Sequence, residues 1–141
     1  MAEIVPSIIA QNLEELKKKM VQAEGLVTWV QLDIMDGRFV PAVSWSAPDD
    51  LETIDGKTKI EAHLMVDGPE GYLPEWRKYV DRILVHEEAT DHFAEIADAF
   101  DGSIVELGAV LKMETPIEKL EDFGDKLKVI QLMSIDQLGG Y

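Results

Sequence analysis

Strand-like and helix-like patterns of apolar residues alternate along the whole chain. Strand-like segments carry apolar residues at every second position or in short runs, and helix-like segments repeat them every three or four positions. The pattern predicts strands at 3–10, 28–35, 58–66, 81–87, 105–111 and 127–135, and helices at 12–25, 48–54, 69–80, 91–101 and 116–124. Repeated strand–helix steps of this kind predict a parallel sheet with right-handed crossover connections.

The two faces of the predicted strands differ in polarity. One face is apolar almost throughout and would pack against helices: Ile4, Ile8, Val30, Leu32, Ile34, Ile60, Leu64, Ile83, Val85, Ile130 and Leu132. The other carries polar or soft side chains toward the strand ends: Ser7, Gln31, Asp33, Met35, Glu61, His63, Met65, His86, Gln131 and Met133. A parallel sheet with helices on both faces has strands that are apolar throughout. The difference favours a (β/α) barrel over a doubly wound sheet, with the polar side chains meeting at the carboxyl-terminal rim.

The run W-V-Q-L-D-I-M at 29–35 is the clearest case of polar residues on a buried strand. Val30, Leu32 and Ile34 lie on one face, and Gln31 and Asp33 lie on the other. Burying an amide and a carboxylate costs several kcal/mol unless each finds a partner. We therefore expect Gln31 and Asp33 to point into a shared internal site.

Composition and charge narrow the class of protein. The chain has 141 residues, of which 46% are hydrophobic and 29% charged, and this length suits one domain over 1–141. A formal net charge of −15 argues against nucleic acid or an anionic membrane as partner. The absence of cysteine excludes disulfides and thiolate sites. No signal-peptide pattern and no long apolar run occur, so a cytoplasmic location is expected.

Several runs, in their order and spacing, resemble the ribulose-phosphate 3-epimerase family of TIM-type (β/α)8 barrels over essentially the whole chain. The runs are V-P-S-I-I-A, V-Q-L-D-I-M-D-G-R-F-V-P, E-A-H-L-M-V, L-V-H-E-E-A-T, G-A-V-L-K-M-E-T-P-I-E-K-L and I-Q-L-M-S-I. The pattern D-x-M-D-G-x-F-V-P together with H-L-M is the most specific part. The resemblance implies the first six βα units of such a barrel, an open partial barrel in which strands seven and eight are missing.

The resemblance implies an isomerase of the pentose phosphate pathway. The reaction would interconvert D-ribulose 5-phosphate and D-xylulose 5-phosphate by proton transfer at C3. Two aspartates on opposite sides of the substrate would exchange the proton. A divalent metal of the Zn, Fe, Mn or Mg class, held by two histidines and these aspartates, would stabilise the enediolate.

The resemblance also assigns roles to residues of this chain. Asp33 corresponds to an acid/base that is also a metal ligand, and His63 to a histidine that binds the metal and contacts substrate. His86 takes a supporting place on the fourth strand. Further substrate-side positions are Ser7, Met35, Met65, Met133, Gly139 and Gly140.

Three departures from the family pattern bear on these roles. The first metal-binding histidine of the family falls at Gln31, whose amide oxygen is a weaker ligand. The phosphate-side loop reads S-I-D-Q-L-G-G-Y at 134–141, where Asp136 adds an unfavourable charge beside the glycines. The second aspartate and the main phosphate-binding turns belong to strands seven and eight, which the sequence lacks.

Two alternatives to this epimerase remain open at this point. One is a relative that acts on another ketose phosphate, since Gln31 changes the site. The other is a non-catalytic barrel remnant or fragment. In each case the expected ligand is a small sugar phosphate. Unpaired first and sixth strands would leave apolar surface open, so we expect marginal stability or association, with a homo-oligomer as one possible outcome.

Overall fold

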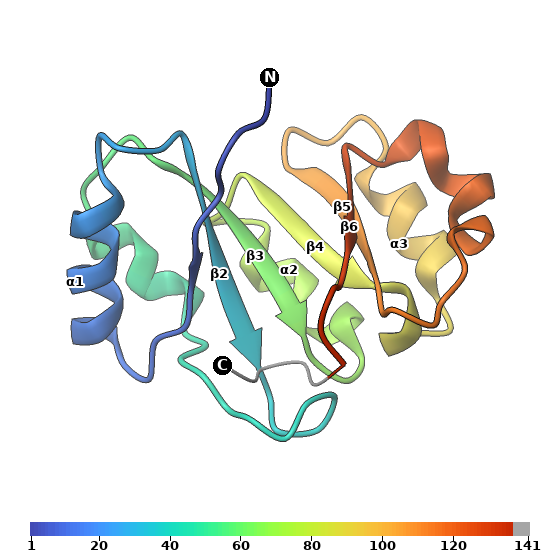
Figure 1. The fold of residues 1–141 in the computed structure, drawn as a ribbon, viewed down its shortest axis with the longest axis horizontal. Coiled ribbons are helices and arrows are strands. Elements are labelled where there is room, and N and C mark those ends of the chain that lie inside the picture. The colour runs from blue at the N-terminus through green and yellow to red at the C-terminus, as the bar shows by residue number, and fades with distance from the viewer. Residues whose placement is uncertain (137–141) are drawn as a thin grey trace.

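The chain folds into one sheet of parallel strands, in a computed structural model that describes residues 1–136. The six strands follow one another in the order β1-β2-β3-β4-β5-β6. They curve into an open half-barrel, with the helices outside the sheet (Figure 1). The strands are β1 (Ser7–Ile8), β2 (Trp29–Met35), β3 (Lys59–Met65), β4 (Arg82–His86), β5 (Glu106–Leu111) and β6 (Val129–Leu132). This arrangement confirms the prediction of a partial barrel.

Short helices connect the strands and cover the outer face of the sheet. The α-helices are α1 (Leu13–Ala23), α2 (Leu73–Trp76) and α3 (Phe93–Phe100). The 3₁₀ helices are η1 (Pro48–Thr53), η2 (Pro69–Gly71), η3 (Glu87–Ala89) and η4 (Ile117–Lys126). The Asn12 side chain accepts a hydrogen bond from the Glu15 N–H at 2.9 Å and so caps the amino-terminal end of α1. Among residues 1–136, no helix is both long and apolar enough to cross a lipid bilayer.

Three predicted helices differ from the structure in type or continuity. The segment 69–80 divides into η2 and the four-residue α2. Pro74 lies at the start of α2, where its missing N–H is tolerated; within one continuous helix it would break the hydrogen-bond ladder. The segments 48–54 and 116–124 form the 3₁₀ helices η1 and η4 rather than α-helices.

The first and last strands are shorter than predicted. Only Ser7 and Ile8 of the segment 3–10 form β1, which pairs with β2 alone. Pro6 has no N–H to donate to a ladder, although its carbonyl accepts from the Gln31 N–H at 2.9 Å. The predicted strand 127–135 is reduced to the four residues of β6. Both strands lie at the edges of the described sheet.

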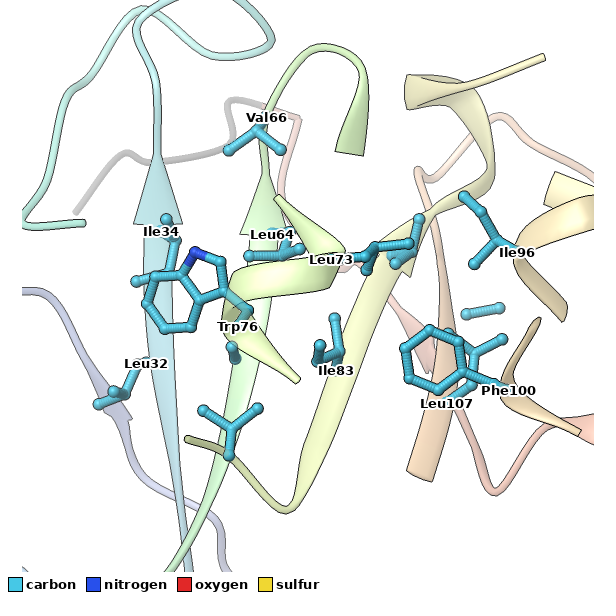
Figure 2. Close-up of a cluster of buried hydrophobic side chains, with 14 of the residues drawn as sticks. Leu32, Ile34, Leu64, Val66, Leu73, Trp76, Ile83, Ile96, Phe100 and Leu107 are labelled. Atoms are coloured by element: carbon cyan, nitrogen blue, oxygen red, sulfur yellow. The ribbon is translucent and has the colours of Figure 1, made fainter. Parts of the chain in front are cut away.

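The main hydrophobic core lies between the outer face of the sheet and the helices. Figure 2 shows Leu73 and Trp76 of α2 over the middle of the sheet, and Ile96 and Phe100 of α3 near Leu107. The strand side chains in this core are those of the apolar face: Ile8, Val30, Leu32, Ile34, Ala62, Leu64, Ile83, Val85, Leu107, Ala109 and Leu111. Their burial on the helix side turns the alternate side chains toward the inside of the half-barrel.

Three residues predicted to pack on helices are exposed instead. Ile4 is 79% exposed, Ile130 42% and Leu132 63%. Ile4 lies before the short β1. Ile130 and Leu132 lie on β6, where η4 packs mainly toward β5 and α3. The prediction is wrong at these three positions because the helices cover the middle of the described sheet and leave its edges bare.

Candidate functional site

The register of β2 and β3 brings the two main predicted site residues together. Asp33 and His63 are Cα partners in this parallel pair, so their side chains leave the sheet on the same inner side. Asp33 Oδ1 lies 3.1 Å from His63 Nδ1. The His63 side chain is 1% exposed and that of Asp33 12%. The carboxylate is therefore at the accessible edge of the pair, with the imidazole beneath it.

Gln31 completes a three-residue cluster with this pair. Its Nε2 donates to Asp33 Oδ1 at 2.9 Å and lies 3.3 Å from His63 Nδ1. The neighbouring carboxylate requires this orientation, because the amide oxygen in the same place would face a second oxygen that also has no proton to donate. The expectation that Gln31 and Asp33 share an internal site is therefore met by their direct contact.

A second histidine extends the cluster into the interior. His63 Nε2 and His86 Nε2 lie 2.9 Å apart, and the two rings are stacked with centroids 5.0 Å apart. The other ring nitrogen of His86, Nδ1, lies 3.2 Å from Glu88 Oε2. The His86 side chain has no exposed surface. A continuous buried chain of polar contacts thus runs from Asp33 through both imidazoles to Glu88.

The environment favours a neutral His86 beside an ionised Glu88. Burial lowers the pKa of His86 to about 4, assisted by His63 and Lys112, although Glu88 opposes this shift. Burial by itself would raise the pKa of Glu88. Hydrogen bonds from His86, Thr115 and the Lys112 N–H outweigh it and lower that pKa to about 2.

The loop after β2 lies against this chain of contacts. The Phe39 ring packs on the His86 ring with centroids 4.8 Å apart, and Lys112 Nζ lies 4.3 Å from the Phe39 centroid. Ser44 Oγ donates to the Asp33 carbonyl at 2.8 Å and accepts from the Met35 N–H at 3.0 Å. The backbone around Asp33 is therefore tied to the far end of the loop.

The three methionines predicted for the site gather in one small apolar cluster. Met35 and Met65 are buried Cα partners on β2 and β3, and Met133 packs against them. Val40 and the partly buried Phe39 of the same loop belong to this cluster. Their common position agrees with the sequence pattern, and their role in shielding an intermediate from water stays a prediction.

The remaining predicted positions are less well defined by the structure. Ser7 is exposed on β1, where it is the Cα partner of Gln31. Gly139 and Gly140 lie outside the described residues. Glu61, expected near the rim, instead contacts Arg82 near the amino-terminal ends of the strands.

Cavities are found beside the cluster rather than within it. One of about 330 Å³ is lined by the loops after β3 and β4 and includes Glu88. Another of about 340 Å³ shares Glu88 and extends to Lys119. Asp33 and His63 line neither of them. Glu88, at the far end of the cluster from Asp33, therefore borders both of these cavities.

The donor set of the cluster does not fit a divalent cation. Such a cation needs lone pairs of oxygen or nitrogen atoms that all point toward it. Asp33 and His63 each offer one, but Gln31 turns its NH₂ group toward both. Within residues 1–136, no three His, Cys, Asp or Glu side chains gather closely enough to hold a metal ion. The side chains described here therefore differ from the metal site that the resemblance implies.

Glu88 and Phe39 are site residues that sequence reasoning missed. Glu88 follows the strand residue His86 by two positions but lies in the 3₁₀ helix η3. Two adjacent glutamates after a strand also fit a solvated loop, so the sequence held no usable signal for this contact. Phe39 lay inside the recognised run D-G-R-F-V-P, but nothing local showed that its ring reaches the fourth strand.

Comparisons with known proteins show which family this chain is similar to. The family model described as "Ribulose-phosphate 3 epimerase family" matches residues 3–140. A ribulose-phosphate 3-epimerase of Bacillus subtilis is 29% identical over 140 residues, covering 96% of this chain and 64% of that protein. Proteins of the same name from Mycobacterium tuberculosis and Chlamydia muridarum are 29% and 32% identical. The alignments cover 94% of this chain in both cases, and 58% and 59% of those proteins.

The chain thus spans about three-fifths of the length of these curated relatives. The match runs through all six described strands and includes the cluster formed by Gln31, Asp33 and His63. On this evidence, the chain belongs to the ribulose-phosphate 3-epimerase family.

Proposed function

We propose that the protein carrying this chain epimerises a ketopentose 5-phosphate at C3, and that Asp33 is one of its acid/base residues. The observation that carries the proposal is the contact of Asp33 with His63 at the carboxyl-terminal side of β2 and β3. Sites of (β/α) barrels lie at this end of the strands. We expect D-ribulose and D-xylulose 5-phosphate as the substrate pair, and the family and its relatives are named for ribulose phosphate.

Asp33 has the exposure and the neighbours that proton abstraction requires. Its side chain is 12% exposed, so a substrate can reach it, while Gln31 fixes the position of Oδ1 by a hydrogen bond of 2.9 Å. In the proposed step the C3–H bond breaks and its proton moves to the Asp33 carboxylate. The electron pair of that bond becomes part of an enediolate. Return of a proton to the opposite face of C3 gives the epimer.

Some neighbours of Asp33 position its carboxylate, and others exclude water from the site. His63 lies beneath the carboxylate, and Phe39 covers His86 on the adjacent strand. The methionines of β2 and β3 supply an apolar wall next to the reacting end. An apolar wall strengthens electrostatic interactions with a developing charge. We propose this role for Met35, Met65 and Met133.

Exchange of the substrate proton with solvent tests the function directly. In D₂O, D-ribulose 5-phosphate should gain deuterium at C3, and proton NMR measures the rate of this exchange. Asp33→Asn should lower the exchange rate by about 10²–10⁴-fold, the usual contribution of a positioned acid/base group. Asp55→Asn is the matched control, since Asp55 is exposed and precedes β3, at the opposite end of that strand from His63. Unchanged exchange in Asp33→Asn would show that Asp33 is not the base.

A second candidate is epimerisation of a different ketose phosphate. It is favoured by Gln31, whose amide forms part of the cluster where a histidine is expected. The same exchange experiment with ketohexose and ketotetrose phosphates decides between them by the ratio of exchange rates. Absence of exchange with every ketose phosphate would favour the non-catalytic remnant. The cytoplasmic location and the homo-oligomer stay predictions from the sequence.

A further inference from the structure

The amide nitrogen of Gln31 lies within hydrogen-bonding distance of two acceptors at once. Nε2 is 2.9 Å from Asp33 Oδ1 and 3.3 Å from His63 Nδ1, and those two atoms are only 3.1 Å apart. An NH₂ group has two donors and no lone pair available for a cation. The amide nitrogen therefore faces both of the atoms that a metal shared by Asp33 and His63 would need.

The contacts beyond His63 determine which ring nitrogens carry protons. If His63 Nδ1 accepts from Gln31, the proton of this neutral imidazole is on Nε2 and is donated to His86 Nε2 at 2.9 Å. His86 then carries its own proton on Nδ1, which donates to Glu88 Oε2 at 3.2 Å. Each donor in this chain of hydrogen bonds has one acceptor. Only the contact between Asp33 Oδ1 and His63 Nδ1 joins two acceptors, and the Gln31 amide lies against both.

The opposite set of tautomers satisfies the contacts less well. With its proton on Nδ1, His63 would donate to Asp33, but that hydrogen would compete with the Gln31 amide hydrogens. His86 would then donate from Nε2 and turn an unprotonated Nδ1 toward the Glu88 carboxylate. Two of these contacts would be unfavourable instead of one. Unpaired polar groups in a buried network cost more than they do in water.

We infer that Gln31 takes the place of a cation in this cluster: its NH₂ group lies against both Asp33 and His63 and fixes the proton of His63 on Nε2. The three residues thereby form a metal-independent site. The direction of the hydrogen bonds through His86 to Glu88 follows from the same tautomer. This inference concerns what the cluster binds and does not depend on which sugar phosphate is the substrate.

The tautomer of His63 can be measured on the unmodified chain. Long-range ¹⁵N–¹H correlation spectra at pH 8, above the ordinary pKa of histidine, distinguish a protonated ring nitrogen from an unprotonated one. We expect His63 to show an unprotonated Nδ1 and a protonated Nε2, and His86 the reverse. A protonated Nδ1 in His63 would overturn the inference. The measurement needs no substrate, activity or variant.

Zinc titration tests whether the same cluster binds a metal ion. Isothermal titration calorimetry measures zinc affinity, and NMR spectra show whether zinc binds at His63. Zinc should leave the His63 resonances of the wild-type chain unchanged. Gln31→His replaces the NH₂ donor with an imidazole nitrogen that can bind a metal. Zinc affinity should therefore rise by about tenfold or more, the size of effect that single residues near a metal have. Gln22→His, which adds a histidine on the exposed side of α1, should leave affinity unchanged.

The outcomes separate this inference from the proposed epimerase. Zinc binding at His63 in the wild type, with affinity equal to that of Gln31→His, would overturn it, because the amide would then behave as a ligand. An equal gain in Gln22→His would also overturn it. If Gln31→His does not fold, as judged by circular dichroism, the wild-type spectra and titration still decide. Failure of sugar-phosphate exchange alone would refute the proposed function and leave this inference standing.

Discussion

Asp36 shows how a single carboxylate shapes the loop that covers the site. Its Oδ1 accepts from the N–H groups of Arg38 and Phe39 at 2.8 and 3.0 Å, and its Oδ2 accepts from the Asp67 N–H at 2.8 Å. The loop after β2 is thereby joined to the loop after β3. Burial by itself would raise the pKa of Asp36, but these hydrogen bonds lower it below its usual value.

The lowered pKa predicts a pH-dependent effect of Asp36→Asn on stability. A carboxylate whose pKa is lower in the folded state stabilises that state at any pH above its unfolded pKa, here about 3.8. This stabilisation is lost as the pH falls through the folded pKa. Asp36→Asn should therefore lower the free energy of unfolding at pH 7 by about 1 kcal/mol. The difference should shrink below about pH 4 in urea unfolding curves. Asp122→Asn, on the exposed part of η4, should show no such trend.

The residue scale also shows what the sequence could and could not predict about the site. Gln31 and Asp33 were recognisable because polar side chains on a buried strand need partners. Their contact with His63 followed once the strands were placed side by side. Glu88 was not recognisable, because a glutamate after a strand is as common on a solvated loop. Its role depends on the burial of His86 against it, which only the tertiary structure shows.

At the scale of elements, β3, β4 and β5 are joined inside the barrel by one arginine. Arg82 lies 2.7 Å from a carboxylate oxygen of Glu61 and 2.6 Å from one of Glu106. Its guanidinium also lies over the Trp29 ring, 4.0 Å from the centroid. Four neighbouring strands therefore meet at this side chain, below the layer that holds Asp33 and His63.

Removal of this arginine should weaken the sheet strongly. Arg82→Met would leave the buried Glu61 carboxylate without its cation, and breaking such a pair costs about 3–5 kcal/mol. Urea unfolding should show that loss, and adding Glu61→Gln in the same chain should recover part of it. Lys78→Met is the control, since the Lys78–Glu75 pair is exposed and such pairs contribute less than about 1 kcal/mol. Equal effects of the two single changes would refute this role for Arg82.

The elements were predictable to different degrees for physical reasons. The bounds of β2 to β5 agree with the predictions to within one or two residues, because one face of each strand is continuously buried under helices. β1 and β6 were predicted too long, since an edge strand pairs on one side only. The segment 69–80 has a helical pattern of apolar residues, but Pro69 and Pro74 divide it into two short helices.

At the scale of the whole molecule, the described half-barrel leaves apolar surface on both sides of its opening. Figure 1 shows β1 and β6 at the two ends of the curved sheet, each paired on one side only. Ile4 precedes β1, and Ile130, Leu132 and Ile135 lie on or after β6, all exposed. Free strand edges beside apolar side chains promote pairing with other chains. This apolar surface lies at the two edge strands of the described six-stranded sheet.

The 141-residue chain should therefore self-associate in a way that depends on β6. Ile130→Lys combined with Leu132→Lys places two charges on its bare outer face and should shift sedimentation velocity profiles toward the monomer, because like charges oppose edge pairing. The same variant should bind less of a dye that fluoresces on apolar surface. Val21→Lys combined with Leu26→Lys changes two apolar residues that are more exposed than those of β6, at α1 and the turn after it. If wild type and both variants sediment as monomers at every concentration, or if the α1 variant disperses the chain as well, the β6 face does not drive association.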